Sequence, residues 1–389
     1  MSTLLATYDP APITIVSGHG CTLVDSHGRE YLDFIGGIAV CALGHCHPAI
    51  TAAIEEQAKR LVHASNLYTH EPALTLATQL TKRSGMARAF FCNSGTEANE
   101  AAIKLARKWA FRAGEARRTT ILACTGSFHG RTLGSLAATD NAKYRHGFAP
   151  LPGGFAFAKF NDGSDLESKV NDRVAAVLVE PVQGESGVHV AERSFLQAAR
   201  RLCDERGALL IFDEIQCGMG RLGPLFAFEH FGVRPDVVTV AKALANGLPI
   251  GAMLANERAA GAFAPGDHGS TFGGSPVPAA AGLAHLRVRD ELGLQGRVEE
   301  RSAQVFAALR ELQKKHARTL GDLRGLGLLV GIGVRTPYEA KAVQTAARER
   351  GLLVGTAGGN TLRFAPALIV GEHDVERAIE IVDDALRAA

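Results

Sequence analysis

The chain has 389 residues, of which 46% are hydrophobic and 21% are charged, and its formal net charge is +2. This length exceeds one ordinary hydrophobic core, so two domains are expected. The small net charge argues against nucleic acid as a partner. Because no run of about 18 apolar residues occurs, no membrane span is expected.

The start of the chain and its cysteines indicate a cytoplasmic protein. Met1 to Ala6 shows no basic region ahead of an apolar stretch, so no secretory signal is expected. The seven cysteines are irregularly spaced and include no CxxC pair. Such usage is typical of reduced thiols in a reducing compartment.

The first predicted element is a hairpin with strands at residues 22–25 and 31–34. Short apolar runs that end in polar residues or glycine then predict buried strands at 89–92, 120–124, 174–179, 208–212 and 236–240. Apolar residues at helical spacing predict helices at 96–111 and 194–206. Strands alternating with helices indicate an α/β fold with a mostly parallel sheet, covered on both faces.

The last third of the chain has a different pattern, which predicts a smaller α+β domain. Its elements are a helical stretch at 283–312, strands at 330–334, 352–355 and 361–364, and a closing amphipathic helix at 374–386. We predict a large domain at 51–280 and a small domain at 281–389. The N-terminal segment 1–50 is assigned to the small domain, although the sequence leaves this open.

Ligands bind beyond the carboxyl ends of the strands in an open parallel sheet, so the residues after each predicted strand are informative. The segment Asn93 to Asn99 follows the first strand and opens a helix, where small residues with free N–H groups make an anion site. An ordinary helix cap by Ser94 or Thr96 is the alternative. Phe128 and Arg131 follow the next strand and suit a planar ligand and a carboxylate, or else form a packed ring and a solvated charge.

Acidic groups and a lysine follow the remaining strands. The segments beginning at Glu180 and at Asp213 could supply acid–base groups, metal ligands or helix caps. Lys242 stands at the end of an apolar strand, after Ala241. Desolvation there makes an amine nucleophilic, unless the side chain snorkels to solvent. Pyridoxal phosphate needs a lysine, an acid at its ring nitrogen, an anion cradle and apolar faces, and successive strand ends offer each of these.

Two other patterns point to different classes of protein. Gly218 to Gly223 matches GxGxxG, but five residues separate it from the strand and no helical pattern starts at its third glycine. Cys41, His45, Cys46 and His47 could suggest zinc, but they lack two separated ligand pairs. We therefore expect neither a nicotinamide site nor a metal site.

Several motifs in one order resemble those of the class III aminotransferases, from about Gly18 to Ala367. The motifs are Asn93-Ser94-Gly95-Thr96-Glu97-Ala98-Asn99, Phe128-His129-Gly130-Arg131, Glu180-Pro181-Val182-Gln183-Gly184-Glu185, Asp213-Glu214-Ile215-Gln216 and Gly269-Ser270-Thr271-Phe272-Gly273-Gly274. Segments 36–40, 44–48 and 216–221 resemble the acetylornithine aminotransferases within that class.

The resemblance implies a fold-type I enzyme that binds pyridoxal 5′-phosphate and acts as a homodimer. It assigns Lys242 to the Schiff base, Asp213 to the pyridine nitrogen and Gln216 to the ring hydroxyl. The remaining implied cofactor residues are Phe128 and Ile215 at the ring faces, Glu214 in the same motif, Gly95 and Thr96 at the phosphate, and Thr271 from the partner subunit. The implied substrate residues are Arg131, Ser270, Glu185 and Arg363.

The resemblance also implies the reaction, in which the distal amine of N2-acetyl-L-ornithine passes to 2-oxoglutarate in arginine biosynthesis. Arg363 would bind the glutamate α-carboxylate and pair with Glu185 while the acylated substrate reacts, and apolar Ile38 would leave room for the acyl group. Succinylornithine and succinyldiaminopimelate remain alternative substrates. The alternative classes are an aminomutase, a nicotinamide oxidoreductase and a non-catalytic pyridoxal-phosphate-binding protein.

Two departures from the family pattern stand near these motifs. Ala245-Asn246-Gly247 replaces a more glycine-rich stretch, and Ser275 stands where Asn is usual. We expect neither departure to change the reaction.

Overall fold

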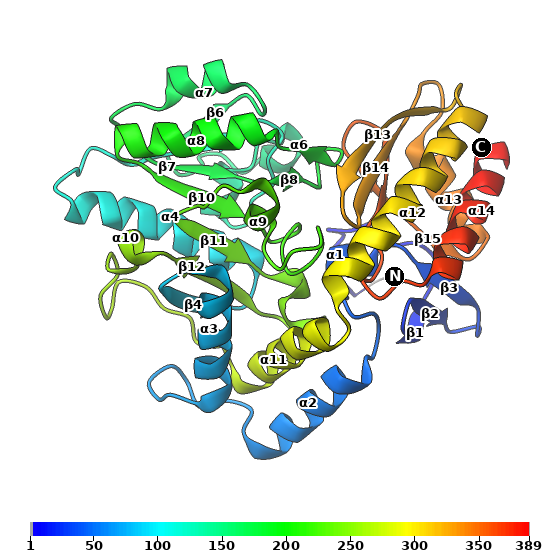
Figure 1. Ribbon diagram of the computed structural model, residues 1–389, viewed down its shortest axis with the longest axis horizontal. Helices are drawn as coiled ribbons and strands as arrows, with labels where there is room; N and C mark the ends of the chain where they lie inside the picture. Colours follow the sequence, from blue (N-terminus) through cyan, green and yellow to red (C-terminus); the bar gives the residue numbers. More distant parts are fainter. Residues whose placement is uncertain (1–2, 389) are drawn as a thin grey trace.

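The computed structural model describes residues 3–388, so the ends of the predicted first and last segments, Met1, Ser2 and Ala389, lie outside the described residues. Figure 1 shows a sheet flanked by helices on the left and smaller sheets with long helices on the right. None of the helices within residues 3–388 is long and apolar enough to cross a bilayer.

The main sheet has seven strands in the order β4-β12-β11-β10-β7-β5-β6. Their bounds are β4 Arg88–Cys92, β5 Thr120–Cys124, β6 Phe155–Ala158, β7 Val174–Val179, β10 Leu209–Asp213, β11 Val237–Val240 and β12 Gly251–Ala255. Only β12 runs antiparallel to its neighbours. The mostly parallel sheet and the five predicted strands are confirmed, whereas β6 and β12 were not predicted.

Helices cover both faces of this sheet because alternate strand residues point to opposite sides. On one face, Leu209 and Ile211 of β10 pack with α4 (Gly95–Arg112). On the other face, Leu210 and Phe212 pack with α8 (Arg193–Arg206). Both helices agree with the predicted ones. The other helices of this part are α2 Pro48–Arg60, α3 Glu71–Ser84, α5 Leu133–Ala137, α6 Ala142–Arg145, α7 Gly163–Lys169, α9 Ala227–Phe231, α10 Glu257–Ala260 and α11 Pro276–Glu291.

The N-terminal hairpin lies beside C-terminal elements, as the blue and red segments of Figure 1 show. Strand β3 pairs antiparallel with β2 and parallel with β15. One small sheet has the strand order β1 Ile15–His19, β2 Thr22–Asp25, β3 Glu30–Asp33 and β15 Leu352–Leu353. A second has the order β13 Leu320–Leu326, β14 Leu329–Val334, β17 Thr361–Phe364 and β16 Gly355–Ala357. The long helices are α12 Leu294–Lys315, α13 Ala340–Glu349 and α14 Glu372–Ala388. The domain boundaries at 50 and 280 stay predictions, and residue 280 falls within α11.

Two predicted elements are each divided in the structure. The helical stretch 283–312 is two helices, because Leu292 ends α11 and Gly293, with φ 57°, turns the chain before α12. Such a left-handed backbone favours glycine. The strand 352–355 is also divided, because Leu352–Leu353 pairs with β3 whereas Gly355 begins a strand of a different sheet.

Candidate active site

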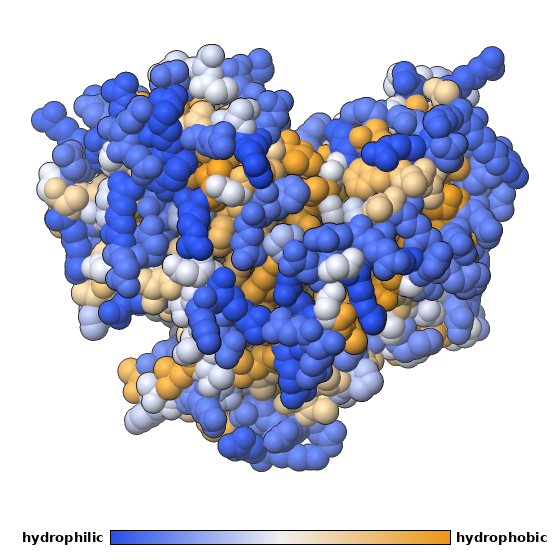
Figure 2. Space-filling view, in the orientation of Figure 1, coloured by the Kyte–Doolittle hydropathy of each residue, from blue (hydrophilic) through white to orange (hydrophobic). Residues whose placement is uncertain are grey.

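A cavity of about 390 Å³ lies beyond the carboxyl ends of the main strands. It brings together the predicted residues Gly95, Thr96, Phe128, Arg131, Glu185, Asp213, Ile215, Gln216 and Lys242. Residues 247–250 also line it, because β12 runs in reverse and enters the sheet at the edge where the other strands leave. In Figure 2 a notch with apolar residues at its floor separates the two parts of the molecule.

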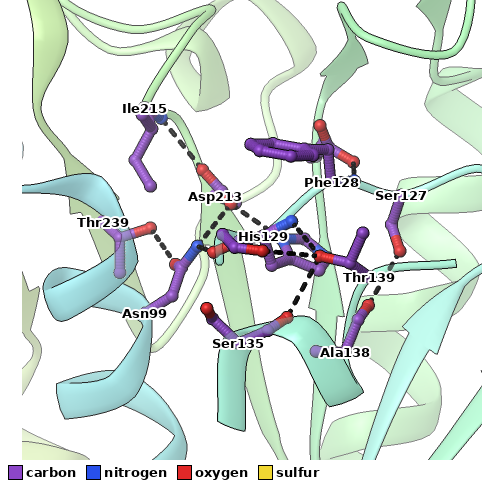
Figure 3. Close-up of polar contacts among 12 residues, drawn as sticks. Asn99, Ser127, Phe128, His129, Ser135, Ala138, Thr139, Asp213, Ile215 and Thr239 are labelled. Carbon is purple, nitrogen blue, oxygen red and sulfur yellow. Dashed lines mark hydrogen bonds and ion pairs between the residues drawn. The ribbon is translucent and has the colours of Figure 1, made fainter. Parts of the chain in front are cut away.

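Asp213 is held at the end of β10 by a buried hydrogen-bond network (Figure 3). Its Oδ2 contacts both His129 Nδ1 and Asn99 Nδ2 at 2.7 Å, and its Oδ1 accepts a bond from the Ile215 backbone. Asn99 Oδ1 accepts a further bond from Thr239 Oγ1 at 2.8 Å. A carboxylate with this many fixed partners keeps one orientation.

Sequence reasoning missed both His129 and Asn99 as functional residues. A signal was present for Asn99, because it lies four residues before Ile103 and so shares the apolar face of the predicted helix. A polar side chain on a buried helix face needs a hydrogen-bond partner. For His129 no comparable signal existed, because its partner Asp213 is 84 residues away.

Lys242 follows β11 and begins η1 (Lys242–Ala245) with a left-handed φ of 45°. Burial lowers the pKa of its ammonium group below the ordinary value. Arg363 adds to this lowering, whereas the carboxylates of Glu185, Asp213 and Glu180 oppose it. A lowered pKa increases the fraction of neutral, nucleophilic amine.

Arg363 on β17 pairs with Glu185, with 2.6 Å between Nη1 and Oε1. Gln216 Nε2 donates to the same Oε1 at 2.9 Å, and Arg363 also donates to the Gly184 carbonyl. Burial alone would raise the pKa of Glu185, but the charges of Arg363 and Lys242 and these hydrogen bonds outweigh it and lower the pKa. Only 6% of Arg363 is exposed, so this is not a surface pair.

Arg131 is positioned by aromatic rings. Its Cζ lies 3.7 Å from the ring centroid of Tyr144 and 5.5 Å from that of Phe128. The two rings contact each other edge to face, with their centroids 5.8 Å apart. Guanidinium groups are attracted to aromatic faces in this way, which leaves the Arg131 N–H groups able to bind a carboxylate.

The first turn of α4 forms one wall of the cavity. A Cβ added at Gly95 would lie 2.8 Å from side-chain carbons of Ile215, so only glycine fits there. Thr96 Oγ1 contacts Ser135 Oγ at 2.6 Å and accepts from the Arg131 backbone at 3.2 Å. The N–H groups at a helix start lack partners within the helix and attract an anion.

Four predicted residues do not line this cavity. One is Arg363, which pairs with the lining residue Glu185, and the others are Glu214, Ser270 and Thr271. The buried carboxylate of Glu214 accepts bonds from Ala227 and Phe228 backbone nitrogens at 2.6 and 2.8 Å, and so caps α9. Burial raises the pKa of Glu214 to about 8, although these two hydrogen bonds lower it. Ser270 and Thr271 line a separate hollow.

Glu180 also lines the cavity, and its Oε2 accepts from the Phe128 backbone at 3.1 Å. Burial and the neighbouring charge of Asp213 raise its pKa well above the usual value. The Glu180 side chain therefore fixes the Phe128 backbone at the cavity wall through this hydrogen bond.

The GxGxxG match and the Cys/His cluster of the sequence both lie in structures of other kinds. Gly218 to Gly223 forms turns in which no helix begins. His45 Nε2 bonds to Asp33 Oδ2 at 2.8 Å, and within residues 3–388 no three His, Cys, Asp or Glu side chains group as metal ligands would. All seven cysteines are free.

The cavity fits pyridoxal phosphate. It combines an amine on Lys242, a fixed carboxylate on Asp213, apolar walls from Phe128 and Ile215, and the anion-binding helix start at Gly95. These are the groups that the cofactor requires for its imine, its ring nitrogen, its ring faces and its phosphate.

Residues 4–386 match the family model "Aminotransferase class-III", and the chain belongs to this family. It is 45% identical to an acetylornithine aminotransferase of Clostridium acetobutylicum, over 99% of both chains. It is also 45% identical to a succinylornithine transaminase of Yersinia pseudotuberculosis, over 97% of this chain and 92% of the relative.

Solved structures agree with this assignment. The N-acetylornithine aminotransferase of Stenotrophomonas maltophilia superposes with a TM-score of 0.86 at 38% identity, covering 97% of this chain and 96% of that one. An ornithine aminotransferase of Toxoplasma gondii, described with partial occupancy of pyridoxal phosphate at its active site, gives a TM-score of 0.95 at 32% identity. That match covers 99% of this chain and 92% of the other.

Proposed function

We propose that this chain is a pyridoxal-phosphate-dependent transaminase that passes the distal amino group of N2-acetyl-L-ornithine to 2-oxoglutarate. The products are N-acetylglutamate 5-semialdehyde and glutamate. The observation that carries the proposal is one cavity lined by Lys242, by the fixed Asp213 carboxylate and by Glu185, which pairs with the buried Arg363. The names of the relatives support the choice of substrate.

When bound, pyridoxal phosphate supplies an electron-withdrawing ring that stabilises negative charge on the substrate carbon. Asp213 would keep a proton on the ring nitrogen, because its carboxylate is fixed there by His129 and Asn99. Phe128 and Ile215 would cover the ring faces, and Gln216 would bind the ring hydroxyl. The first turn of α4, at Gly95 and Thr96, would bind the phosphate.

Lys242 would hold the cofactor and then act as the proton carrier. Its Nζ would take a proton from the substrate carbon that bears the amino group and deliver it to the cofactor carbon. The lowered pKa suits this role, because a general base must be neutral near the working pH.

The Glu185–Arg363 pair would let one cavity accept two different substrates. While the acylated substrate reacts at its distal amine, the paired Arg363 is unavailable to a carboxylate. Glutamate brings an α-carboxylate that would displace Glu185 from Arg363. Arg131 would bind the remaining substrate carboxylate.

The partner subunit would complete the site in a homodimer. Thr271 lies outside the cavity of its own chain and is exposed, so it could serve the cavity of a neighbouring chain, whereas Ser270 Oγ accepts from Asn93 and Gly273 of its own chain. We leave Glu214 out of the cofactor site because it caps α9. Sedimentation that finds an active monomer would refute the shared site. The seven free cysteines support a cytoplasmic location. The names of the acetylornithine relatives support arginine biosynthesis as the pathway.

The test is the variant Lys242→Ala, compared with Lys159→Ala, whose side chain is 72% exposed. Lys242→Ala should lose the visible absorbance of the bound cofactor and all turnover with acetylornithine and 2-oxoglutarate. Lys159→Ala should keep both. Near-normal turnover of Lys242→Ala would overturn the proposal.

Succinylornithine is a second candidate substrate, favoured by the similarity to the succinylornithine transaminase. Val40 lines the cavity, whereas Ile38, which was expected to leave room for the acyl group, is 47% exposed and does not line it. Kinetics with acetylornithine, succinylornithine, succinyldiaminopimelate and free ornithine would rank these substrates.

Titration with NAD would detect an oxidoreductase, and lack of a half-reaction with glutamate would indicate a non-catalytic binding protein.

A further inference from the structure

Asn246 occupies an unusual position at the end of the turn that begins with Lys242. Both Lys242 and Asn246 have left-handed backbones, with φ 45° and 48°; Lys242 begins η1 and Asn246 caps its C-terminal end. Residues other than glycine adopt this conformation at a cost, so the surrounding structure must hold them in it.

The Asn246 side chain holds a second segment, residues 40–44, which we call the Val40 loop. Its Oδ1 accepts from the Leu43 backbone nitrogen at 2.6 Å, and its Nδ2 donates to the Gly44 carbonyl at 3.0 Å. Asn246 is 8% exposed and Leu43 is fully buried. Both backbone groups would lack these partners in a buried environment if the carboxamide were removed.

The Val40 loop is also bound to elements far from Lys242. The Ala42 carbonyl accepts from the Leu368 nitrogen at 2.6 Å, and His45, the residue after the loop, pairs with Gly20. Val40 and Lys242 line the same cavity. The carboxamide of Asn246 thus connects the Lys242 turn to a wall that belongs to another part of the molecule.

We propose that Asn246 is a positioning residue that fixes the Lys242 turn and the Val40 loop relative to each other. It acts through these two groups and does not itself line the cavity. This inference rests on the proposed function and deepens it, because it concerns the position of the Lys242 amine in the cavity.

The test uses Asn246→Gly, because glycine accepts the left-handed backbone and removes only the carboxamide. Asn246→Asp keeps an acceptor for Leu43 but loses the donor for Gly44. Asn360→Gly is the matched control. Asn360 also has a left-handed φ of 55°, and its carboxamide accepts from Ala340 and donates to Val334, away from the cavity.

Two measurements are made on each variant. In the protein without cofactor, Asn246→Gly should increase hydrogen exchange of the Val40 loop by about tenfold or more and leave β7 and β10 unchanged. In the holoenzyme, kcat per bound cofactor should fall about tenfold while KM changes by less than about threefold, because the amine is misplaced but the substrate contacts remain. Asn246→Asp should show the same loss of kcat, and Asn360→Gly should keep the wild-type kcat.

The outcomes separate this inference from the proposed function. If wild-type protein shows no transamination, the proposed function fails, and the exchange measurement still tests whether Asn246 holds the loop. If wild-type protein is active and Asn246→Gly matches it in both exchange and kcat, the positioning role is refuted. Faster exchange with an unchanged kcat would show a purely structural contact and would also overturn the inference.

Discussion

Replacing Glu185 with glutamine should shift the preference of the enzyme toward glutamate. Glu185 neutralises Arg363 across 2.6 Å, and glutamate must break this pair before its α-carboxylate can bind there. The substituted glutamine side chain keeps a similar shape and can still accept a hydrogen bond, but it carries no charge. The acylated substrate gains nothing from the change, because it does not use Arg363.

The size of the shift follows from the environment of the pair. Two unit charges about 4 Å apart interact by about 1 kcal/mol in water and about 4 kcal/mol near a protein surface. The Glu185 side chain is 25% exposed, and glutamine would keep part of the hydrogen bonding, so the lower end of this range applies. We expect the ratio of kcat/KM values to move toward glutamate by about tenfold or more, or about 1.4 kcal/mol.

The assay measures each half-reaction separately by following cofactor absorbance with glutamate or with acetylornithine. The control is Glu205→Gln, which removes a Glu–Arg pair at the surface, where Glu205 is 52% exposed. It should leave the ratio unchanged. An equal loss in both half-reactions of Glu185→Gln, or no change in either, would show that Glu185 does not control substrate choice.

Two further changes test packing and charge. In Gly184→Ala, the new Cβ would lie 1.5 Å from Gln216 Oε1, so Gln216 must move and cofactor affinity should fall by about tenfold or more, as measured by titration. Gly163→Ala, whose Cβ would meet only Ala198 at 4.0 Å, should bind the cofactor normally, and equal affinities for the two variants would contradict the reasoning. For His45, the hydrogen bond to Asp33, aided by Cys41, raises the pKa to about 10. Because the folded-state pKa is the higher one, this stabilisation is complete below about pH 6.5 and is lost as the pH rises through about 10. The difference in unfolding free energy between wild type and His45→Gln should therefore shrink over that range in urea titrations, and a constant difference would refute it.

The strands of the main sheet could be predicted because their residues are apolar and bounded by polar groups. Strand β10 lies at Leu209–Asp213, one residue from its predicted place. Strand β12 could not be predicted in this way, since Gly251–Ala255 is rich in alanine and glycine, which have low β-propensity. It is a strand because it fits between β4 and β11 and pairs with both of them.

The site residues that stand at strand ends could be predicted from the sequence. The contacts that depend on tertiary packing could not. Asp213 directly follows its predicted strand, and Lys242 follows its predicted strand after one residue, Ala241. The contact of Asp213 with His129 depends on which strands become neighbours, and a pattern of apolar residues does not contain that information. Tyr144, which packs on Arg131, belongs to a four-residue helix too short for periodicity to reveal.

The pairing of β3 with β15 has a consequence for the synthesis of the protein on the ribosome. Strand β3 is translated early, but its native neighbour Leu352–Leu353 emerges only after more than three hundred further residues. Until then one edge of β3 lacks its native partner, and an open strand edge invites pairing with other chains. The main sheet, which needs only residues 88–255, can form while that edge is still unpaired. A nascent chain arrested before residue 352 should therefore aggregate through its first strands even when its central sheet has folded.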